Sequence, residues 1–157
     1  MKLLIKQRVF SWTDTYDVYD EAGIAKYYVK AEFFTLGHVI HVYDRYDREV
    51  GCIRQRLLTF LPRFGIEING RELGEIKQEF TFFHPEYSID FNGWSVTGDF
   101  LGWDYQITDA SGREVVTISK ELFHWGDTYA LTIHDPANEL PALLTVLAID
   151  AANCSKS

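Results

Sequence analysis

Hydrophobic and polar residues alternate one by one along most of this chain of 157 residues. In residues 27–33, Val29 and Ala31 fall on one side of an extended backbone. Lys30 and Glu32 fall on the other side. A period of two residues places successive side chains on opposite faces of a β-sheet. The alternation therefore predicts β-strands with one buried, apolar face and one face in water.

Turn signals separate the alternating stretches. Asn69-Gly70 and Asn92-Gly93 indicate tight hairpins, because both central residues of a type I′ turn adopt positive φ. Further turn signals lie at residues 20–23, 44–47 and 109–112. These turns predict about twelve antiparallel strands in sequential order. The predicted strands span residues 3–10, 16–20, 26–34, 38–43, 50–60, 64–69, 73–83, 86–91, 94–101, 103–108, 114–123 and 127–133.

An internal repeat supports this division. The phrase F-x-W-x-D-T-Y occurs at residues 10–16 and again at residues 123–129, with looser aromatic copies between them. One apolar position also recurs 20 to 24 residues apart, at Val29, Ile53, Ile76, Val96 and Ile118. The chain is thus predicted to form six hairpin-like repeats joined by aromatic corners.

The last apolar stretch, LPALLTVLAIDAA at Leu140–Ala152, has no alternation. A sheet of this size has two edges that pair with other chains unless it closes into a barrel, and a barrel this wide needs something to fill it. Asn138 is a suitable N-cap, and Pro141 lacks only an N–H that has no partner in the first helical turn. We therefore predict a helix at about residues 138–152 inside a closed barrel.

The predicted helix is apolar on all sides, as buried helices and membrane-spanning helices are. Fifteen residues give a length of about 22 Å, which is short of the ~30 Å hydrocarbon core of a bilayer. We therefore expect a buried helix, and the protein is not expected to be an integral membrane protein. Asp150 is the polar exception, and it needs a partner such as a strand N–H or an arginine. It is either a functional buried acid or, as we favour, a pin that holds the helix in the barrel.

The predicted fold is therefore mainly β, a closed antiparallel barrel enclosing a central C-terminal hydrophobic α-helix. A single domain over residues 1–157 accounts for the whole chain, with a disordered tail at residues 153–157. The net charge of −8 and the pI near 5.0 exclude a typical nucleic-acid-binding protein. The first 63 residues carry a charge of +2 and the remainder −10, so an anion-binding surface is expected in the first half.

Two cysteines, Cys52 and Cys154, are too few for a disulfide framework, and the N-terminus has no signal-peptide core. The protein is expected to be cytoplasmic, and a peripheral position at the membrane is compatible with this. Neither cysteine has the surroundings in sequence of an activated thiolate, and G-x-S-x-G is absent from the sequence. Nothing in the sequence implies a cofactor.

Three separated motifs resemble the LURP-one-related family, in particular its bacterial members. They are L-x-I-K-Q-x-x-F-S at residues 3–11, K-Y-Y-V-K-A-E-F-F-T-L-G at residues 26–37, and W-G-D-T-Y at residues 125–129 with A-I-D-A at residues 148–151. The resemblance covers nearly the whole chain. It implies a twelve-stranded barrel around a hydrophobic helix, as in the tubby C-terminal domain and the phospholipid scramblases. Some proteins of this fold bind phosphoinositides or act on lipids, but this is an analogy of fold.

Basic residues are the main candidates for a binding site. Lys30, Arg54 and Lys77 occupy the same place in three successive hairpins, so we expect them to face outward on neighbouring strands. With Arg56 they could bind a phosphate or an anionic membrane surface. The alternative is an ordinary solvated sheet face, since nearby Glu residues reduce the local potential.

Other candidates are weaker. His38 and His41 point to opposite faces of one strand, so the histidines predict no metal site. Asp44, Asp47 and Glu49 crowd a turn without the spacing of a calcium loop. The tryptophan corners at Trp12 and Trp125 form either an exposed aromatic site or, as we favour, plugs at the barrel ends.

The sequence favours a non-enzymatic binding or scaffold module that recognises a phospholipid membrane surface or a protein partner. The alternatives are scramblase-like movement of lipids and a small hydrolase with a site at a barrel mouth. A filled barrel argues against the hydrolase, because it leaves no deep cavity.

Overall fold

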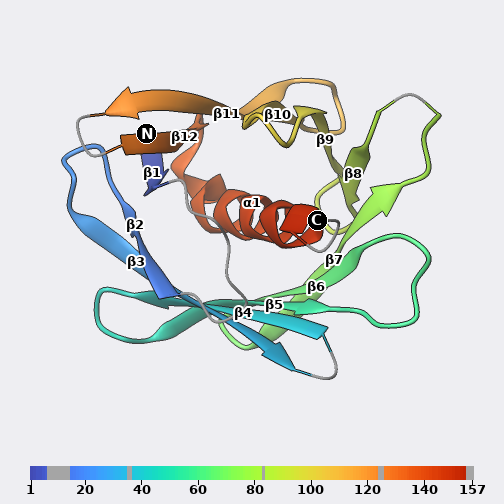
Figure 1. Cartoon of the computed structure of the whole chain (residues 1–157), viewed down its shortest axis with the longest axis horizontal. Helices are drawn as coiled ribbons and strands as arrows, with labels where there is room; N and C mark the ends of the chain where they lie inside the picture. Colours follow the sequence, from blue (N-terminus) through green and yellow to red (C-terminus); the bar gives the residue numbers. More distant parts are fainter. Residues whose placement is uncertain (7–14, 35–36, 83, 124–125, 155–157) are drawn as a thin grey trace.

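A computed structural model describes residues 1–6, 15–34, 37–82, 84–123 and 126–154. These residues form twelve β-strands, a short 3-10 helix η1 and an α-helix α1 (Figure 1). The strands are β1 Lys2–Lys6, β2 Thr15–Tyr19, β3 Ala25–Phe34, β4 Gly37–Asp44, β5 Glu49–Gln55, β6 Arg63–Ile68, β7 Arg71–Glu79, β8 Glu86–Ile89, β9 Trp94–Asp99, β10 Asp104–Thr108, β11 Glu114–Phe123 and β12 Gly126–Ile133. The helices are η1 Pro136–Asn138 and α1 Glu139–Cys154.

The sheet closes on itself. Each strand pairs antiparallel with its neighbours in sequence, and β1 pairs with β12, with Leu3 opposite Leu131. In such an up-and-down barrel, successive loops lie alternately at the two ends. The predicted closed antiparallel barrel is confirmed.

Helix α1 lies inside the ring of strands (Figure 1). Leu143, Leu144, Val146 and Ile149, which cover different sides of the helix, have no exposed surface. The repeated apolar positions of the wall are also fully buried, and they are Val29, Ile53, Ile76, Val96 and Ile118. The prediction of a buried central helix is therefore confirmed. The described part of the chain contains no helix with the length and apolarity that a bilayer crossing requires.

Several strands are shorter than predicted, and β5 and β7 differ most. Strand β5 ends at Gln55 instead of residue 60, and β7 ends at Glu79 instead of residue 83. Leu58 has a φ of 60°, a conformation that does not continue a strand. In the second loop, the Thr81 hydroxyl donates to the carbonyl of His84 and closes a local turn. The apolar residues of both segments therefore belong to loops. The predicted end of the first strand, at residues 7–10, lies outside the described residues.

Polar contacts hold the start of α1. Lys26 Nζ lies 2.6 Å from Glu139 Oε1, and the Tyr27 hydroxyl donates to the other oxygen of this carboxylate. The short helix η1, which ends at the predicted N-cap residue Asn138, has its own cap, because the Asp135 side chain accepts from the Ala137 N–H at 3.0 Å. The helical path begins earlier than expected, with η1, and α1 extends to Cys154.

The helix approaches the wall closely at Gly51 on β5. A Cβ atom at this position would lie 2.9 Å from Leu144 Cδ2, and the nearest three atoms all belong to Leu144. Such a distance forces a shift in a packed core. Gly51 thus lets α1 and β5 pack against each other.

We predict that Gly51→Ala lowers the free energy of unfolding by about 1–3 kcal/mol through overpacking. Leu144→Ala should lower it by about 2–5 kcal/mol by leaving a cavity. Because the alanine methyl at position 51 would enter that cavity, the double variant should lose less than the sum by at least about 0.5 kcal/mol. Urea unfolding measures these values. In the control double variant Gly51→Ala/Leu147→Ala, the two losses in free energy of unfolding should be additive. The same degree of additivity in both double variants would contradict the contact between Gly51 and Leu144.

Candidate functional site

The predicted basic residues face outward but do not lie on neighbouring strands. Lys30 is on β3, Arg54 on β5 and Lys77 on β7, and β4 and β6 separate these strands. The expectation of neighbouring strands was wrong because equal places in successive hairpins are two strands apart in a meander. The side chains of all three are about half exposed.

Each of these three cations has a carboxylate partner on the barrel surface. The pairs are Lys30 Nζ with Glu32 Oε1 at 3.1 Å, Arg54 Nε with Glu67 Oε1 at 3.4 Å, and Lys77 Nζ with Glu79 Oε1 at 3.7 Å. Exposed pairs of this kind stabilise a fold by only about 0–1 kcal/mol. They reduce the local positive potential, yet a phosphate can exchange with the carboxylate at small cost.

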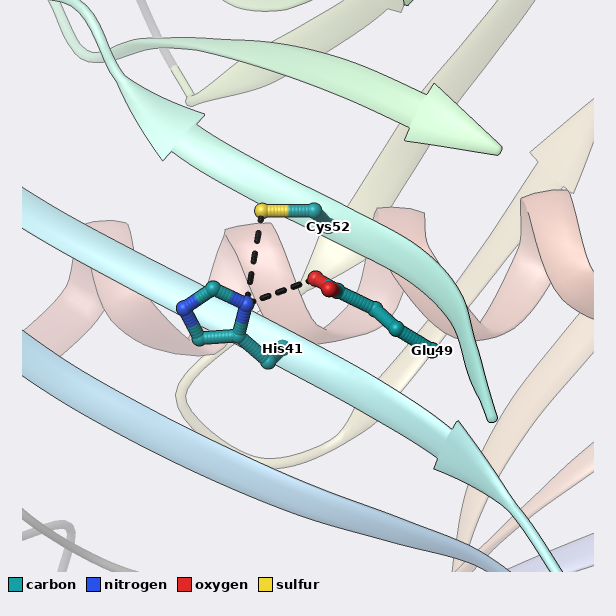
Figure 2. Close-up of side chains that lie close together, drawn as sticks. All are labelled: His41, Glu49 and Cys52. Carbon is teal, nitrogen blue, oxygen red and sulfur yellow. Dashed lines mark hydrogen bonds and ion pairs between the residues drawn. The ribbon is translucent and has the colours of Figure 1, made fainter. Parts of the chain in front are cut away.

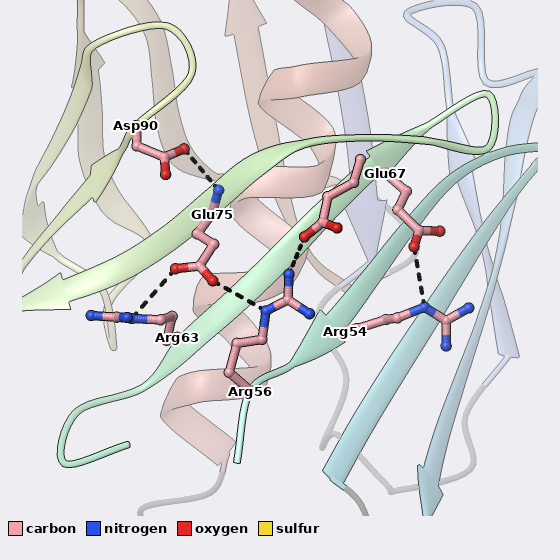
Figure 3. Close-up of polar contacts among 7 residues, drawn as sticks. Arg54, Arg56, Arg63, Glu67, Glu75 and Asp90 are labelled. Atoms are coloured by element: carbon pink, nitrogen blue, oxygen red, sulfur yellow. Dashed lines mark hydrogen bonds and ion pairs between the residues drawn. The ribbon is translucent and has the colours of Figure 1, made fainter. Parts of the chain in front are cut away.

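Arg56 belongs to a larger network (Figure 3). Its guanidinium pairs with Glu72, and its Nε lies 3.2 Å from Glu75 Oε1. Arg63 Nε lies 3.5 Å from the second oxygen of Glu75, so two arginines share this carboxylate. The Glu75 backbone N–H donates to Asp90 Oδ1 at 2.8 Å. The network fixes Arg56 and Arg63 beside the loop that joins β5 to β6.

Apolar side chains project from that loop and from the β7–β8 loop. We call Leu57, Leu58, Phe60, Phe80 and Phe82 the apolar rim. Phe60 is 93% exposed, Phe82 is 87% exposed, and Leu58 is fully exposed. The rings of Phe80 and Phe82 meet edge to face with centroids 5.4 Å apart. Phe60, Phe80 and Phe82 also line one shallow surface hollow of about 330 Å³.

The apolar rim lies at one end of the barrel. The β5–β6, β7–β8 and β9–β10 loops share this end because successive loops alternate. Leu101, in the β9–β10 loop, is 80% exposed. Exposed apolar clusters of this kind mark interaction surfaces. Trp12 and Trp125, the predicted aromatic plugs, lie outside the described residues.

A second group of side chains lies on the outer wall. Register places His41 on β4 directly opposite Cys52 on β5, and Glu49 begins β5 (Figure 2). His41 Nδ1 lies 2.7 Å from Glu49 Oε1 and 3.9 Å from Cys52 Sγ. Their donor atoms all lie within 4.8 Å of one another. Cys52 is only 3% exposed although its side chain is on the outer face.

Sequence reasoning missed this group. The sequence was searched for pairs of histidines and for a calcium loop. This group instead combines one histidine, one glutamate and one cysteine from the two strands of a hairpin. The available signal was the turn at residues 44–47, which fixes the pairing of its flanking strands. Burial raises the pKa of the Cys52 thiol to about 11, with Arg54 acting in the opposite direction. The thiol is therefore protonated at neutral pH and is not an activated nucleophile.

Asp150 is the buried acid of the barrel. The Tyr129 hydroxyl donates to Asp150 Oδ2 at 2.5 Å, and Trp103 Nε1 donates to Oδ1 at 3.3 Å. The rings of Trp103 and Tyr129 stack with centroids 5.0 Å apart. The predicted partner, a strand N–H or an arginine, was wrong, because two aromatic side chains provide the donors. These bonds hold the end of α1 to β12 and to the β9–β10 loop.

Burial raises the pKa of Asp150 to about 6, and the two hydrogen bonds oppose this shift. The carboxylate in turn affects nearby phenols. Burial first, and the charge of Asp150 second, raise the pKa of Tyr87 to about 12 and also raise the pKa values of Tyr105 and Tyr129. Asp150 therefore interacts electrostatically with several phenols near the end of α1.

Comparison with known proteins places the chain in a family. The sequence profile of the LURP-one-related proteins matches residues 1–150. The chain belongs to the LURP-one-related family. The resemblance seen in the three sequence motifs is thereby confirmed.

One curated protein and one solved structure are similar to this chain. The uncharacterized protein YxjI of Bacillus subtilis (strain 168) is 32% identical over 133 residues, which are 85% of this chain and 82% of YxjI. The X-ray structure of a protein from Arabidopsis thaliana is similar with a TM-score of 0.65 and 15% identity. That match covers 95% of this chain and 89% of the plant protein. At this identity it supports the fold of this LURP-one-related chain, and the fold alone.

We predict that Asp150 makes stability depend on pH. Its pKa in the folded protein, about 6, lies above the ordinary value of 3.8, so the native state holds the proton more tightly than the unfolded state. Protonated Asp150 therefore adds up to about 3 kcal/mol to the free energy of unfolding. This contribution is complete below pH 4 and is lost as the pH rises to about 6. Urea unfolding of the wild type and of Asp150→Asn across this range measures it. The difference between the two proteins should change with pH, and parallel curves would contradict the assignment.

Proposed function

We propose that this LURP-one-related protein is a non-enzymatic binding module that docks on anionic phospholipid membranes through its apolar rim. The observation that carries the proposal is the exposure of Phe60 and Phe82, at 93% and 87%, beside the arginine network. Aromatic rings with neighbouring cations suit the interface of a bilayer, where rings enter the headgroup region and cations meet phosphates.

The packing of the barrel supports a binding role over a hydrolase. The helix and the inward side chains fill the interior, and three hollows of the described surface have volumes of about 300–330 Å³ each. Enzyme sites are usually deeper clefts with convergent polar groups. Asp150, whose pKa is raised to about 6, is partly buried and accepts hydrogen bonds from Tyr129 and Trp103.

The shape of the apolar rim favours a bilayer over a protein partner. Leu58 holds a φ of 60°, which costs a non-glycine residue about 1–3 kcal/mol. This conformation accompanies a fully exposed side chain at a loop tip. Single side chains that project in this way suit a soft hydrocarbon layer, whereas protein interfaces bury side chains in matching pockets.

The four predicted basic residues have two different roles in this proposal. Arg56 follows β5 directly, and Lys77 pairs with Arg63 in register, so both lie at the base of the apolar rim. These two would exchange their carboxylate partners for lipid phosphates. Lys30 and Arg54 lie further along the wall and would add long-range attraction to an anionic surface.

Vesicle sedimentation tests the proposal. Wild type should sediment with vesicles of phosphatidylserine and phosphatidylcholine, and Phe60→Ser/Phe82→Ser should bind at least about tenfold more weakly. The matched control is Ile24→Ser/Tyr46→Ser, which removes two exposed apolar side chains from turns at the other end of the barrel. This control should bind like wild type.

Charge reversal separates the basic residues from the rim. Arg56→Glu/Lys77→Glu should weaken binding more than Lys30→Glu/Arg54→Glu, and both losses should shrink in high salt. Equal sedimentation by wild type and the rim variant would overturn the proposal. Absence of wild-type sedimentation would also overturn it and would favour a protein partner. A fluorescent-lipid transfer assay on the same vesicles tests the scramblase-like alternative.

A further inference from the structure

We propose that His41, Glu49 and Cys52 form a binding site for a divalent transition-metal ion, with zinc as the ion that the donor set fits best. This site is on the wall of the barrel and is independent of membrane docking. A nitrogen, a carboxylate oxygen and a sulfur are the three donor types that proteins use for zinc. Hard ions such as calcium and magnesium take oxygen donors instead.

The distances fit one ion between the three donors. In a tetrahedral zinc site, bonds of about 2.0–2.3 Å place neighbouring donor atoms about 3.4–3.6 Å apart. His41 Nδ1 lies 3.9 Å from Cys52 Sγ and 2.7 Å from Glu49 Oε1. The sulfur would move inward by a few tenths of an ångström, and the exposed Glu49 carboxylate would move outward to admit the ion. The third pair of donors, Cys52 Sγ and the Glu49 carboxylate, lies within 4.8 Å, so binding would also draw these two together.

The hairpin holds the donors in place. His41 and Cys52 are directly paired on β4 and β5, and each of these strands also pairs with a second neighbour in the closed barrel. The register shifts between Val42 and Tyr43, so that Glu49 lies opposite Tyr43. From there the longer Glu49 side chain reaches His41. Two of the three donors are thus fixed by paired strands, as a preorganised site requires.

A carboxylate also stands behind the imidazole. His41 Nε2 lies 3.6 Å from Glu32 Oε2, on the side of the ring opposite Nδ1. Metal-binding histidines almost always donate their second ring N–H to a carboxylate, a carbonyl or a water, which fixes the tautomer and strengthens the ligand. Glu32 is itself held by Lys30 at 3.1 Å. This places Lys30, a predicted site residue, in the outer layer of the metal site.

The fourth coordination position faces a hollow. Glu49, Cys52, Arg54 and Glu67 line a partly enclosed space of about 300 Å³. Glu67 is the register partner of Cys52 on β6. A water molecule in this space, or the Glu67 carboxylate after release from Arg54, completes four-fold coordination. Binding displaces the thiol proton of Cys52 into solvent, as coordination of a thiol does in general.

Equilibrium dialysis of the chelator-treated full chain against zinc tests the site. Wild type should bind one zinc per chain, and Cys52→Ser or His41→Ala should weaken binding by more than about 100-fold, beyond the effect usual for outer-layer residues. Cys154→Ser and His134→Ala are the matched controls, since each removes the same residue type elsewhere. Circular dichroism checks that every variant folds.

Cobalt spectroscopy identifies the donors directly. The wild type loaded with Co²⁺ should give a sulfur-to-cobalt charge-transfer band in the near ultraviolet and intense tetrahedral visible bands. Cys52→Ser should lose the first of these. Stoichiometric zinc binding that survives in Cys52→Ser and His41→Ala would overturn the proposal, and so would a wild type that binds no zinc.

The role of Glu32 has its own readout. Glu32→Gln should weaken zinc binding by about tenfold and keep the sulfur-to-cobalt band, because it alters the histidine and not the ligand set. Glu121→Gln, which removes a carboxylate paired with Lys2 on another part of the barrel, is the control. Unchanged affinity in Glu32→Gln would remove Glu32 from the site. None of these variants alters the apolar rim, so failure of the metal site and failure of membrane docking are separable.

Discussion

The burial of an apolar helix in a closed sheet is the constraint on which the rest of this structure depends. Helix α1 is apolar on all sides and has no stable place in water, while the wall formed by β1–β12 encloses a space that its own side chains do not fill. The helix fills the interior of the barrel, and the barrel shields the helix from water. Polar side-chain contacts between the helix and the described wall lie near the helix ends, at Glu139 with Lys26 and Tyr27, and at Asp150 with Tyr129 and Trp103. They define the depth and rotation of the helix in the barrel.

A filled barrel directs chemistry to its outer surface and its ends. Along the wall, cations and carboxylates alternate as weak pairs, so the basic residues do not form one positive field. At the end where α1 finishes, the loops carry Phe60 and Phe82 into solvent. On the outer face of the strands, His41 and Cys52 lie opposite each other, beside a surface hollow that Cys52 and Glu49 line. Function in this architecture is a property of loops and outward side chains.

The barrel, the helix and the buried positions were predictable from the sequence because each depends on local pattern. Asn69-Gly70 marks a turn wherever it stands, and Val29 to Ile118 recur with the length of a hairpin. The apolar rim was not predictable, since residues 57–60 and 80–82 have the composition of strand interiors. The positive φ of Leu58 and the hydrogen bond from Thr81 to His84, which accompany the loops, leave no trace in the hydrophobic pattern. The His41–Cys52 pair was also missed. It depends on register between two strands, which periodicity alone does not specify.

Five consecutive residues of strand β5 connect the packing of the core with the side chains on the outer surface. Gly51 faces inward and admits Leu144 of the helix, Cys52 faces outward beside His41, Ile53 returns to the core, and Arg54 pairs with Glu67 on the surface. Gln55 ends the strand, and the rim loop follows it. A shift of one residue in register would expose Ile53, bury Arg54 and separate Cys52 from His41. Core packing therefore holds the outer group in place, because the same register that fills the barrel also aligns the donors on its wall.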